Sequence, residues 1–308
     1  MRQRVAAVDC GTNSIRLLIA DIDPERTVLT DIAREMRIVR LGEGVDRTGR
    51  LSPAALDRTI GALREYAVLI ARAAPAAVRM VATSATRDAE NAAEFVDRVK
   101  EVLGVAPEVV TGDEEARLSF IGATRELTDT PAPYLVTDIG GGSTEFVLGG
   151  PEGVWGGRSV DIGCVRMTER HLHSDPPSEA EIAAATADID SALELVAASI
   201  PAERASTLVG LAGSVTTVAG IALALASYDP ERIHHSRIPA AQVHEIATGL
   251  LGQTRAQRAA IGVMHPGRVD VIGGGALVLD RIMTRFGFSE VLVSEHDILD
   301  GMAWSLVR

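Results

Sequence analysis

The sequence repeats one short unit, and this repeat limits the folds that the chain can adopt. The stretch AVDCGTNSIRLLIA, which begins at Ala7, aligns with VTDIGGGSTEFVLG, which begins at Val136. In this alignment Asp9 falls on Asp138, and Arg16 falls on Glu145. Each copy has apolar residues on both sides of a glycine-containing turn, which is typical of two strands joined by a hairpin. One copy near the start of each half predicts two related domains that face each other across a cleft.

The segments around the two hairpins alternate between strand and helix patterns, which predicts α/β domains with mixed sheets. Ser52 before Pro53 predicts the start of a long helix, and the stretch 128–133, rich in Pro and Thr, predicts a linker. We therefore expect an N-terminal domain over 1–127 and a C-terminal domain over 128–308. A last helix, about 297–308, could return to the first domain. Glycine turns are expected at Gly213-Ser214 and at 273–275, each before a helix.

Charge and composition exclude several classes of protein. The net charge of −12 argues against a nucleic-acid surface. The chain contains no run of about 18 apolar residues, so no membrane span is expected. The N-terminus shows no export signal, so we expect a cytoplasmic protein. Cys10 and Cys164 are expected to be buried thiols in a reducing compartment. The seven histidines show no metal-ligand spacing, and His234-His235 is expected to be a solvated loop.

The two hairpin turns have the composition of phosphate-binding loops. Glycine lets backbone N–H groups approach phosphate oxygens closely, and Ser, Thr and Asn add side-chain donors. An aspartate at the start of each loop, Asp9 or Asp138, can hold Mg²⁺ against the same oxygens, with Mn²⁺ as a substitute. A single such turn is often only a tight hairpin, but two copies and a later Gly-Ser turn favour phosphate binding. The expected phosphate-binding residues in these turns are Asn13, Ser14, Gly140, Gly141, Gly142, Ser143, Thr144, Gly213 and Ser214.

Six blocks along nearly the whole chain carry a family resemblance. In order they are DCGTNSIRL, ATSATRDAEN, GDEEARLSF, TDIGGGSTEF, LAGSVTTVAG and HPGRVDVI. The chain resembles the exopolyphosphatase and guanosine pentaphosphate phosphohydrolase (Ppx/GppA) family. The resemblance implies two duplicated ribonuclease-H-like domains, as in the superfamily of actin, Hsp70 and sugar kinases, around a central cleft. It also implies hydrolysis of a terminal phosphate with magnesium.

The resemblance implies roles for four residues outside or beside the turns. Glu115 matches the family's general base, Asp138 and Glu145 match its magnesium-binding acids, and Arg87 matches a residue that contacts the phosphate chain. Three of these residues have a plainer alternative. Glu114 and Glu115 could only stabilise a helix N-terminus, Arg87 could lie on a helix surface, and Glu145 could be an exposed strand carboxylate. Arg268 and Asp270 lie in a matching block without an assignable role.

The resemblance leaves the substrate open. Longer family members carry a C-terminal helical extension that this chain lacks, so short-chain inorganic polyphosphate is the first expectation. Guanosine pentaphosphate, a stringent-response nucleotide, is the alternative, because both substrates need the same site. An ATP-dependent kinase of the same superfamily and a non-catalytic alarmone sensor are further alternatives, although no acceptor pocket with a catalytic Asp is evident. A homodimer is expected from the resemblance alone.

Overall fold

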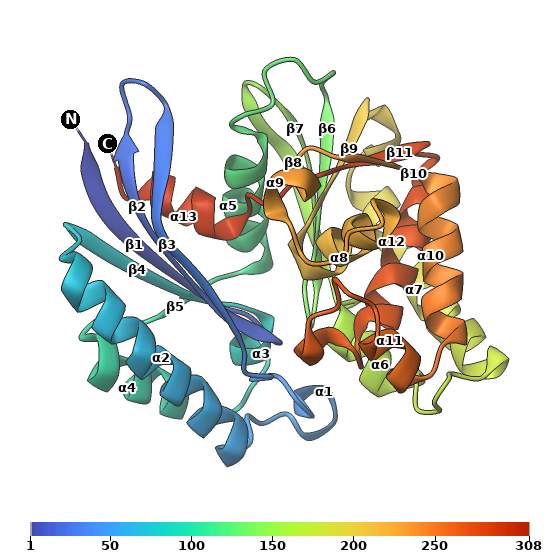
Figure 1. Cartoon of the computed structure of the whole chain (residues 1–308), viewed down its shortest axis with the longest axis horizontal. Helices are drawn as coiled ribbons and strands as arrows, with labels where there is room; N and C mark the ends of the chain where they lie inside the picture. Colours follow the sequence, from blue (N-terminus) through green and yellow to red (C-terminus); the bar gives the residue numbers. More distant parts are fainter. Residues whose placement is uncertain (1, 308) are drawn as a thin grey trace. The chain divides into compact units, whose positions relative to one another are not determined.

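The computed structural model describes residues 2–307 and divides the chain into two compact units (Figure 1). The first unit contains the residues up to Gly122 and those from Ile298 onward, and the second contains Ala123–Asp297. The chain therefore passes from the first unit to the second after Gly122 and returns after Asp297. Among residues 2–307, no helix has the length and apolar character needed to cross a membrane.

The first unit is built on a five-stranded mixed sheet with the order β3-β2-β1-β4-β5. Antiparallel pairing joins β1 to β2 and β2 to β3, whereas β4 pairs parallel to β1 and β5 parallel to β4. The strands are β1 (Gln3–Cys10), β2 (Ser14–Asp23), β3 (Val28–Ile38), β4 (Ala77–Ala82) and β5 (Glu108–Val109).

Helices cover both faces of this sheet. Alternate side chains of β1 point to opposite faces, so each face contributes to a separate core. Ala6 and Val8 belong to a core with α2 and α4, while Val5 and Ala7 belong to a core with α5 and α13 (Figure 1). As predicted, α2 begins with Pro53 after Ser52, whose hydroxyl accepts from Ala55 N at 3.2 Å. The helices are α1 (Val45–Thr48), α2 (Pro53–Ala73), α3 (Ser84–Arg87), α4 (Ala92–Leu103), α5 (Gly112–Thr124, which crosses the unit boundary) and α13 (Ile298–Ser305).

The second unit repeats this strand arrangement and adds one strand. Its order is β10-β11-β9-β6-β7-β8, so β8-β7-β6-β9-β11 corresponds to β3-β2-β1-β4-β5 with the same parallel and antiparallel pairings. The duplicated ribonuclease-H-like fold expected from the sequence is confirmed. The strands are β6 (Tyr134–Ile139), β7 (Thr144–Gly150), β8 (Gly153–Val160), β9 (Thr207–Leu211), β10 (Arg237–Pro239) and β11 (Glu290–Val293).

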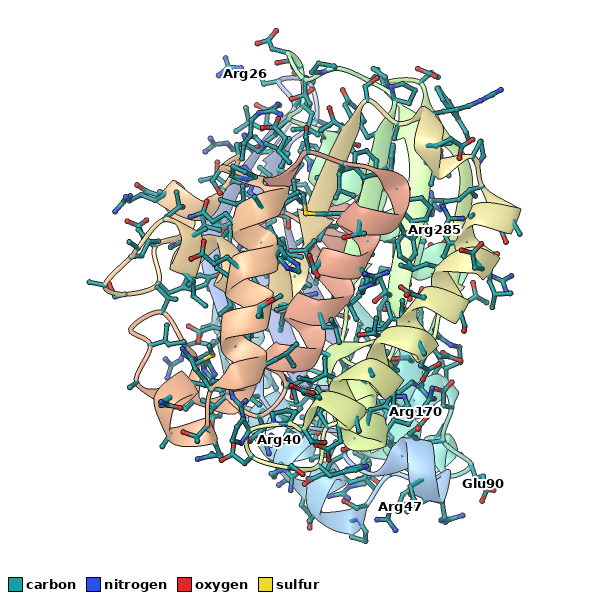
Figure 2. All side chains as sticks on the ribbon, turned by 90° about the vertical axis from the view of Figure 1, so that its right-hand side faces the viewer. Arg26, Arg40, Arg47, Glu90, Arg170 and Arg285 are labelled. Atoms are coloured by element: carbon teal, nitrogen blue, oxygen red, sulfur yellow. The ribbon has the colours of Figure 1, made fainter. Side chains whose placement is uncertain are left out.

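Helices of the second unit pack around the apolar side chains of this sheet in one large core. Ion pairs reinforce the packing of α7 on α12, where Arg285 donates to Glu194 at 2.8 Å and Arg281 to Asp190 at 2.8 Å (Figure 2). The helices are α6 (Cys164–His171), α7 (Glu179–Ser199), α8 (Ala212–Ala222), α9 (Pro230–Ile233), α10 (Ala240–Gly252), α11 (Arg255–Ala259) and α12 (Ile272–Phe286).

Two expected glycine turns are helical, which corrects the sequence-based prediction. Gly213 and Ser214 lie in the first turn of α8, and 273–275 lie in the first turn of α12. The bend from β9 into α8 is made instead by Ala212, which has a left-handed φ of 66°. The glycines are needed for space: a Cβ on Gly275 would lie 2.1 Å from Ser214 Oγ. The expectation that Cys10 and Cys164 are buried thiols is confirmed.

Candidate active site

Two acidic side chains oppose each other on the β6–β7 hairpin of the second unit. Asp138 pairs directly with Glu145 across the antiparallel ladder, so both side chains leave the same face of the sheet. Both are buried, with exposed fractions of 8% and 1%. Ser159, opposite Glu145 on β8, donates a hydrogen bond to Glu145 Oε1 at 2.7 Å. Neighbouring buried carboxylates repel each other unless a proton or a cation lies between them, so this pair fits a divalent cation.

The equivalent positions of the first unit carry opposite charges. Asp9 pairs with Arg16 across β1 and β2, and Arg16 donates to Asp9 Oδ2 through Nε at 3.0 Å and Nη2 at 2.7 Å. The first hairpin therefore supplies its own positive charge. A bidentate guanidinium on Oδ2 competes with a metal ion for that oxygen. The role of Asp9 as a magnesium ligand stays a prediction, and this contact makes it the weakest of the three metal-ligand assignments.

The hairpin turns at the ends of these strands have the same internal hydrogen bond. Gly11 N donates to Ser14 O at 2.9 Å, and Gly140 N donates to Ser143 O at 3.0 Å. Within residues 2–307, the turn amides of Gly141, Gly142 and Ser143 donate to no protein acceptor. Consecutive amides without an internal acceptor form a concave anion site, because they point their N–H dipoles to one place. The geometry of the second turn therefore fits a phosphate group.

The carbonyl groups of the second turn face α6. Gly140 O accepts from Cys164 N at 2.9 Å, Gly141 O accepts from Val165 N at 2.9 Å, and Arg166 Nε donates to Gly142 O at 2.7 Å. With its carbonyls held by α6, the turn has a fixed orientation. Gly163, just before α6, makes this approach possible, since a Cβ there would lie 2.3 Å from Gly141 C and O.

Polar groups at the start of α8 gather beside the same helix. The Arg268 guanidinium occupies the space that a side chain at position 213 would need, with Nη2 2.2 Å from an ideal Cβ on Gly213. Burial raises the pKa of the Cys164 thiol, whereas a Ser214 hydrogen bond and the Arg268 charge act in the opposite direction. Ser214, Cys164 and Arg268 are therefore neighbours. A guanidinium at a helix N-terminus is a favourable place for an anion.

Two of the predicted residues meet in the first unit. Arg87 Nη1 lies 3.3 Å from Glu115 Oε2 and also donates to Val110 O at 3.0 Å. The Glu115 side chain is 11% exposed. Glu114 differs, because its carboxylate accepts two hydrogen bonds from Arg117 at 3.0 Å and lies 3.6 Å from Arg79, which lowers its pKa. Glu114 is thus held in a surface ion-pair network, and Glu115 is the more enclosed acid.

The first hairpin is tied to the helix that carries Arg87. Thr12 Oγ1 and Ser84 Oγ share a hydrogen bond of 2.8 Å, and Ser84 begins α3, which ends at Arg87. Asn13 and Ser14 follow Thr12 in the same turn, and the buried Asn13 Oδ1 has no hydrogen-bond partner among residues 2–307. Asp9, Asn13, Ser14, Arg87 and Glu115 therefore belong to one connected group within the first unit.

The remaining predicted residues belong to the second unit. They are Asp138, Gly140, Gly141, Gly142, Ser143, Thr144, Glu145, Gly213 and Ser214. The Thr144 hydroxyl donates to Ile162 O at 2.9 Å, so its proton is already used within the fold, and its contact with phosphate stays a prediction.

Sequence reasoning missed the polar residues that support these groups. Ser159 holds Glu145, Ser84 holds Thr12, and Arg268 reaches the first turn of α8. Signals existed for Arg268, in the block HPGRVDVI, and for Ser84, in the block ATSATRDAEN. Ser159 could be found only from the β7–β8 register.

Comparisons with known proteins agree with this arrangement. The model of the Ppx/GppA phosphatase family matches residues 18–308. Exopolyphosphatase 2 of Mycobacterium tuberculosis is 52% identical, over 98% of this chain and 98% of that protein. The crystal structure of an exopolyphosphatase from Cytophaga hutchinsonii is 26% identical, with a TM-score of 0.91 over 99% of this chain and 97% of that one. The guanosine-5'-triphosphate,3'-diphosphate pyrophosphatase of Aeromonas hydrophila is 29% identical over 98% of this chain but 59% of that protein. With its duplicated hairpins, opposed acids and amide-lined turn, the chain belongs to the Ppx/GppA phosphatase family.

Proposed function

We propose that this protein is an exopolyphosphatase that hydrolyses the terminal phosphate of inorganic polyphosphate, with a preference for short chains. The observation that carries the proposal is the β6–β7 hairpin, where two opposed buried carboxylates lie beside consecutive amides without a protein acceptor. Carboxylates suit a divalent cation, and free amides suit phosphate oxygens. The similarity to exopolyphosphatase 2 along the whole chain supports the same reaction.

Each group has a distinct role in the proposed reaction. Asp138 and Glu145 would hold Mg²⁺, with Mn²⁺ as a substitute, and the ion would neutralise charge on the phosphate oxygens. The turn amides and Arg268 bind the chain in the second unit, while Asn13, Ser14 and Arg87 do so in the first. Glu115 orients a water molecule and takes its proton. The water oxygen bonds to the terminal phosphorus, and the bridging P–O bond breaks, so phosphate and a shortened chain are released.

Guanosine pentaphosphate is the second candidate substrate. It ends in the same triphosphate chemistry, and the Aeromonas relative is named for a nucleotide of this kind. A panel of defined short polyphosphates and guanosine pentaphosphate, with magnesium or with a chelator, separates the candidates by their kcat/KM values. A higher kcat/KM for the nucleotide would reverse our order. A cytoplasmic location and a homodimer stay predictions of the family resemblance.

Substitution of Glu115 tests the mechanism. A general base contributes about 10²–10⁴-fold to a rate, so Glu115→Gln should lower kcat by at least about 100-fold. Glu114→Gln is the matched control, since that carboxylate is engaged by Arg117 and should leave kcat within a few-fold of the wild type. Phosphate release measured in both variants decides whether Glu115 or Glu114 acts as the base. Near-wild-type release by Glu115→Gln would remove Glu115 as the base, and binding of substrate without any release by the wild type would favour a sensor.

A further inference from the structure

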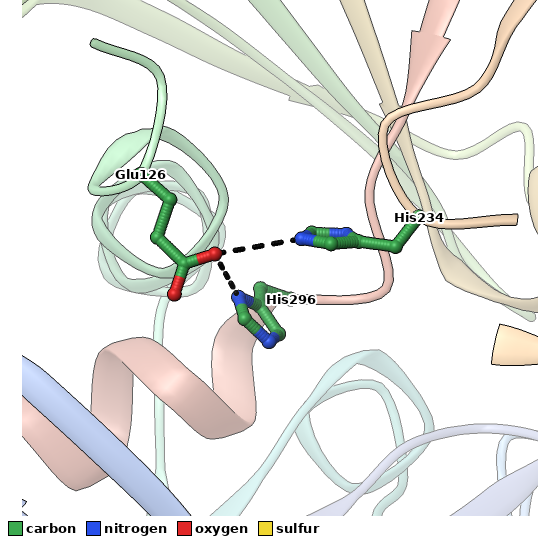
Figure 3. A group of neighbouring side chains, drawn as sticks. All are labelled: Glu126, His234 and His296. Carbon is green, nitrogen blue, oxygen red and sulfur yellow. Dashed lines mark hydrogen bonds and ion pairs between the residues drawn. The ribbon is translucent and has the colours of Figure 1, made fainter. Parts of the chain in front are cut away.

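Three side chains far apart in the sequence meet at a second polar cluster of the second unit (Figure 3). Glu126 follows α5, His234 follows α9, and His296 follows β11. Glu126 Oε2 lies 3.5 Å from His234 Nε2 and 3.3 Å from His296 Nδ1. The three ligand atoms all lie within 4.8 Å of one another. As expected, His234 and His235 lie in a turn and His235 is exposed, but the His234 side chain is only 21% exposed.

The two distances from Glu126 Oε2 to the histidine nitrogens match the ligand separation in the first coordination sphere of a small metal ion. Bonds of about 2.0–2.1 Å from zinc to His nitrogen and to carboxylate oxygen place two tetrahedral ligands about 3.3 Å apart. The two contacts to Glu126 Oε2 are within about 0.2 Å of that separation. The half-exposed Glu126 leaves room for a water molecule as the fourth ligand.

The His234 ring packs against a neighbouring residue. His235 stacks on it with a centroid distance of 3.8 Å, which limits rotation of the ring.

One hydrogen bond opposes metal binding at His234 Nε2. Glu295 N donates to His234 Nδ1 at 3.1 Å, so Nδ1 acts as an acceptor and Nε2 is the ring nitrogen that faces Glu126. A metal on Nε2 would place the ring proton on Nδ1 and remove the acceptor of the Glu295 amide. A metal bound by two imidazoles and a carboxylate can outweigh the loss of one hydrogen bond.

We propose that Glu126, His234 and His296 bind a zinc-class divalent ion at a site separate from the Asp138 and Glu145 pair. Imidazole nitrogen favours zinc and its transition-metal neighbours over magnesium, which prefers oxygen ligands. The ion would join the end of α5 to the loops after α9 and β11. This inference does not depend on the proposed hydrolysis.

Metal titration of the full-length protein tests the proposal. The protein is stripped with a chelator and titrated with Co²⁺ and then Zn²⁺ in excess Mg²⁺, so that the acid pair is occupied. We expect one equivalent of Co²⁺ with the visible absorption of a four-coordinate N/O site, displaced by Zn²⁺. His234→Ala and His296→Ala should weaken binding about tenfold or more. Glu126→Gln, a nearly isosteric change at a half-exposed residue, should do the same while keeping the fold.

Two matched controls distinguish the cluster from other ligands. His244→Ala removes another histidine that contacts a carboxylate, with Nδ1 3.2 Å from both Asp280 oxygens, and should bind Co²⁺ as the wild type does. Glu145→Gln should also bind it normally. The proposal is overturned if the wild type binds no Co²⁺, if Glu126→Gln binds it with unchanged affinity, or if either control loses it. Loss confined to the three cluster variants supports it.

Discussion

The two copies of the hairpin differ in charge at one position of the strand ladder. Arg16 stands opposite Asp9, whereas Glu145 stands opposite Asp138 in the same ladder position. Arg16 therefore provides positive charge directly opposite the aspartate of the first copy, whereas a second acid stands at that position in the second copy.

Substitution of Gly163 by alanine tests how closely the turn between β6 and β7 packs against the residue before α6. Gly163→Ala would place a Cβ 2.3 Å from Gly141 C and O, so backbone has to move. We expect a loss of about 1–3 kcal/mol in the free energy of unfolding, measured with urea, and slower phosphate release. Gly249→Ala in α10 is the control. Nothing lies within 4 Å of its Cβ, and the change should stabilise the protein by up to about 1 kcal/mol. Equal effects of the two variants would contradict the steric argument.

At the level of single residues, motif position and geometry contribute different information. The motif alone selected Glu115 over Glu114, and the structure gives a physical difference, because Arg117 holds Glu114. The sequence predicts turns at Gly213 and Gly275, but both residues are helical. A sequence shows that these residues lack a Cβ, but it does not show which neighbouring atoms occupy the space. No sequence signal indicated the Glu126 cluster, because Glu126 and His234 are 108 positions apart and His296 lies 62 positions further on.

Among the elements, α7 has an N-terminus whose stability depends on pH. The Glu181 carboxylate accepts from Ser178 N at 2.7 Å and from the amides of His173 and Ser174 at 3.0 Å. These bonds, that from Ser178 foremost, lower the pKa of Glu181 to about 2 from its ordinary 4.5. A lowered folded-state pKa means that the stabilisation is present above about pH 4.5 and is lost as the pH falls toward 2.

The Glu181→Gln variant should therefore be less stable than the wild type at pH 7, because a neutral amide accepts these bonds less strongly. The difference in urea midpoint should shrink as the pH is lowered from about 5 to about 3. Glu179→Gln, two residues earlier in the same first turn, is the control and should show no such convergence. A constant gap for Glu181→Gln across this range would show that the carboxylate charge is not the cause.

An ion pair with a buried acid fastens α13 to the sheet of the first unit. Arg34 on β3 donates to Asp300 Oδ1 at 2.6 Å and Oδ2 at 3.3 Å, and the Asp300 side chain is 3% exposed. Arg34→Met takes away this guanidinium and should cost about 3–5 kcal/mol in urea unfolding. Arg26→Met is the control at an 82% exposed arginine and should change stability by less than about 0.5 kcal/mol. Arg34→Met with Asp300→Leu should recover part of the loss; no recovery would point to another cause.

The strength of local signals explains which elements could be predicted. The long helix α2 has a side-chain cap at Ser52, and the sequence predicts its start at Pro53, as observed. The helix α10 has no counterpart in the sequence-based reading. It follows Pro239 without a side-chain cap and contains Gly249, so its packing against α12 rather than its own sequence defines it.

For the molecule as a whole, a net charge of −12 has to be reconciled with a polyanionic substrate. Mg²⁺ at the acid pair would do so locally, and binding to the folded state must also stabilise it. At free Mg²⁺ of 100 times its Kd, the wild type should gain about 2.7 kcal/mol in the free energy of unfolding. Without metal, Glu145→Gln should be the more stable protein, because repulsion with Asp138 is removed.

Addition of Mg²⁺ should therefore reverse the order of stability of the two proteins. Thermal or urea unfolding with and without the ion measures this. Ser159 can still donate to the Gln oxygen, so that contact is retained in the variant. An equal gain of both proteins on adding Mg²⁺ would place the ion elsewhere.

The return of the chain from Asp297 to the first unit has a consequence for biosynthesis. The apolar side chains of β1 that face α13, such as Val5 and Ala7, leave the ribosome at the start of translation, but Met302 and Ala303 leave it after the entire second unit. Until α13 is made, this face of the first unit's sheet is covered only in part, by α5, while the second unit can already be complete. The newly synthesised first unit can therefore aggregate through this face of its sheet until α13 has been synthesised.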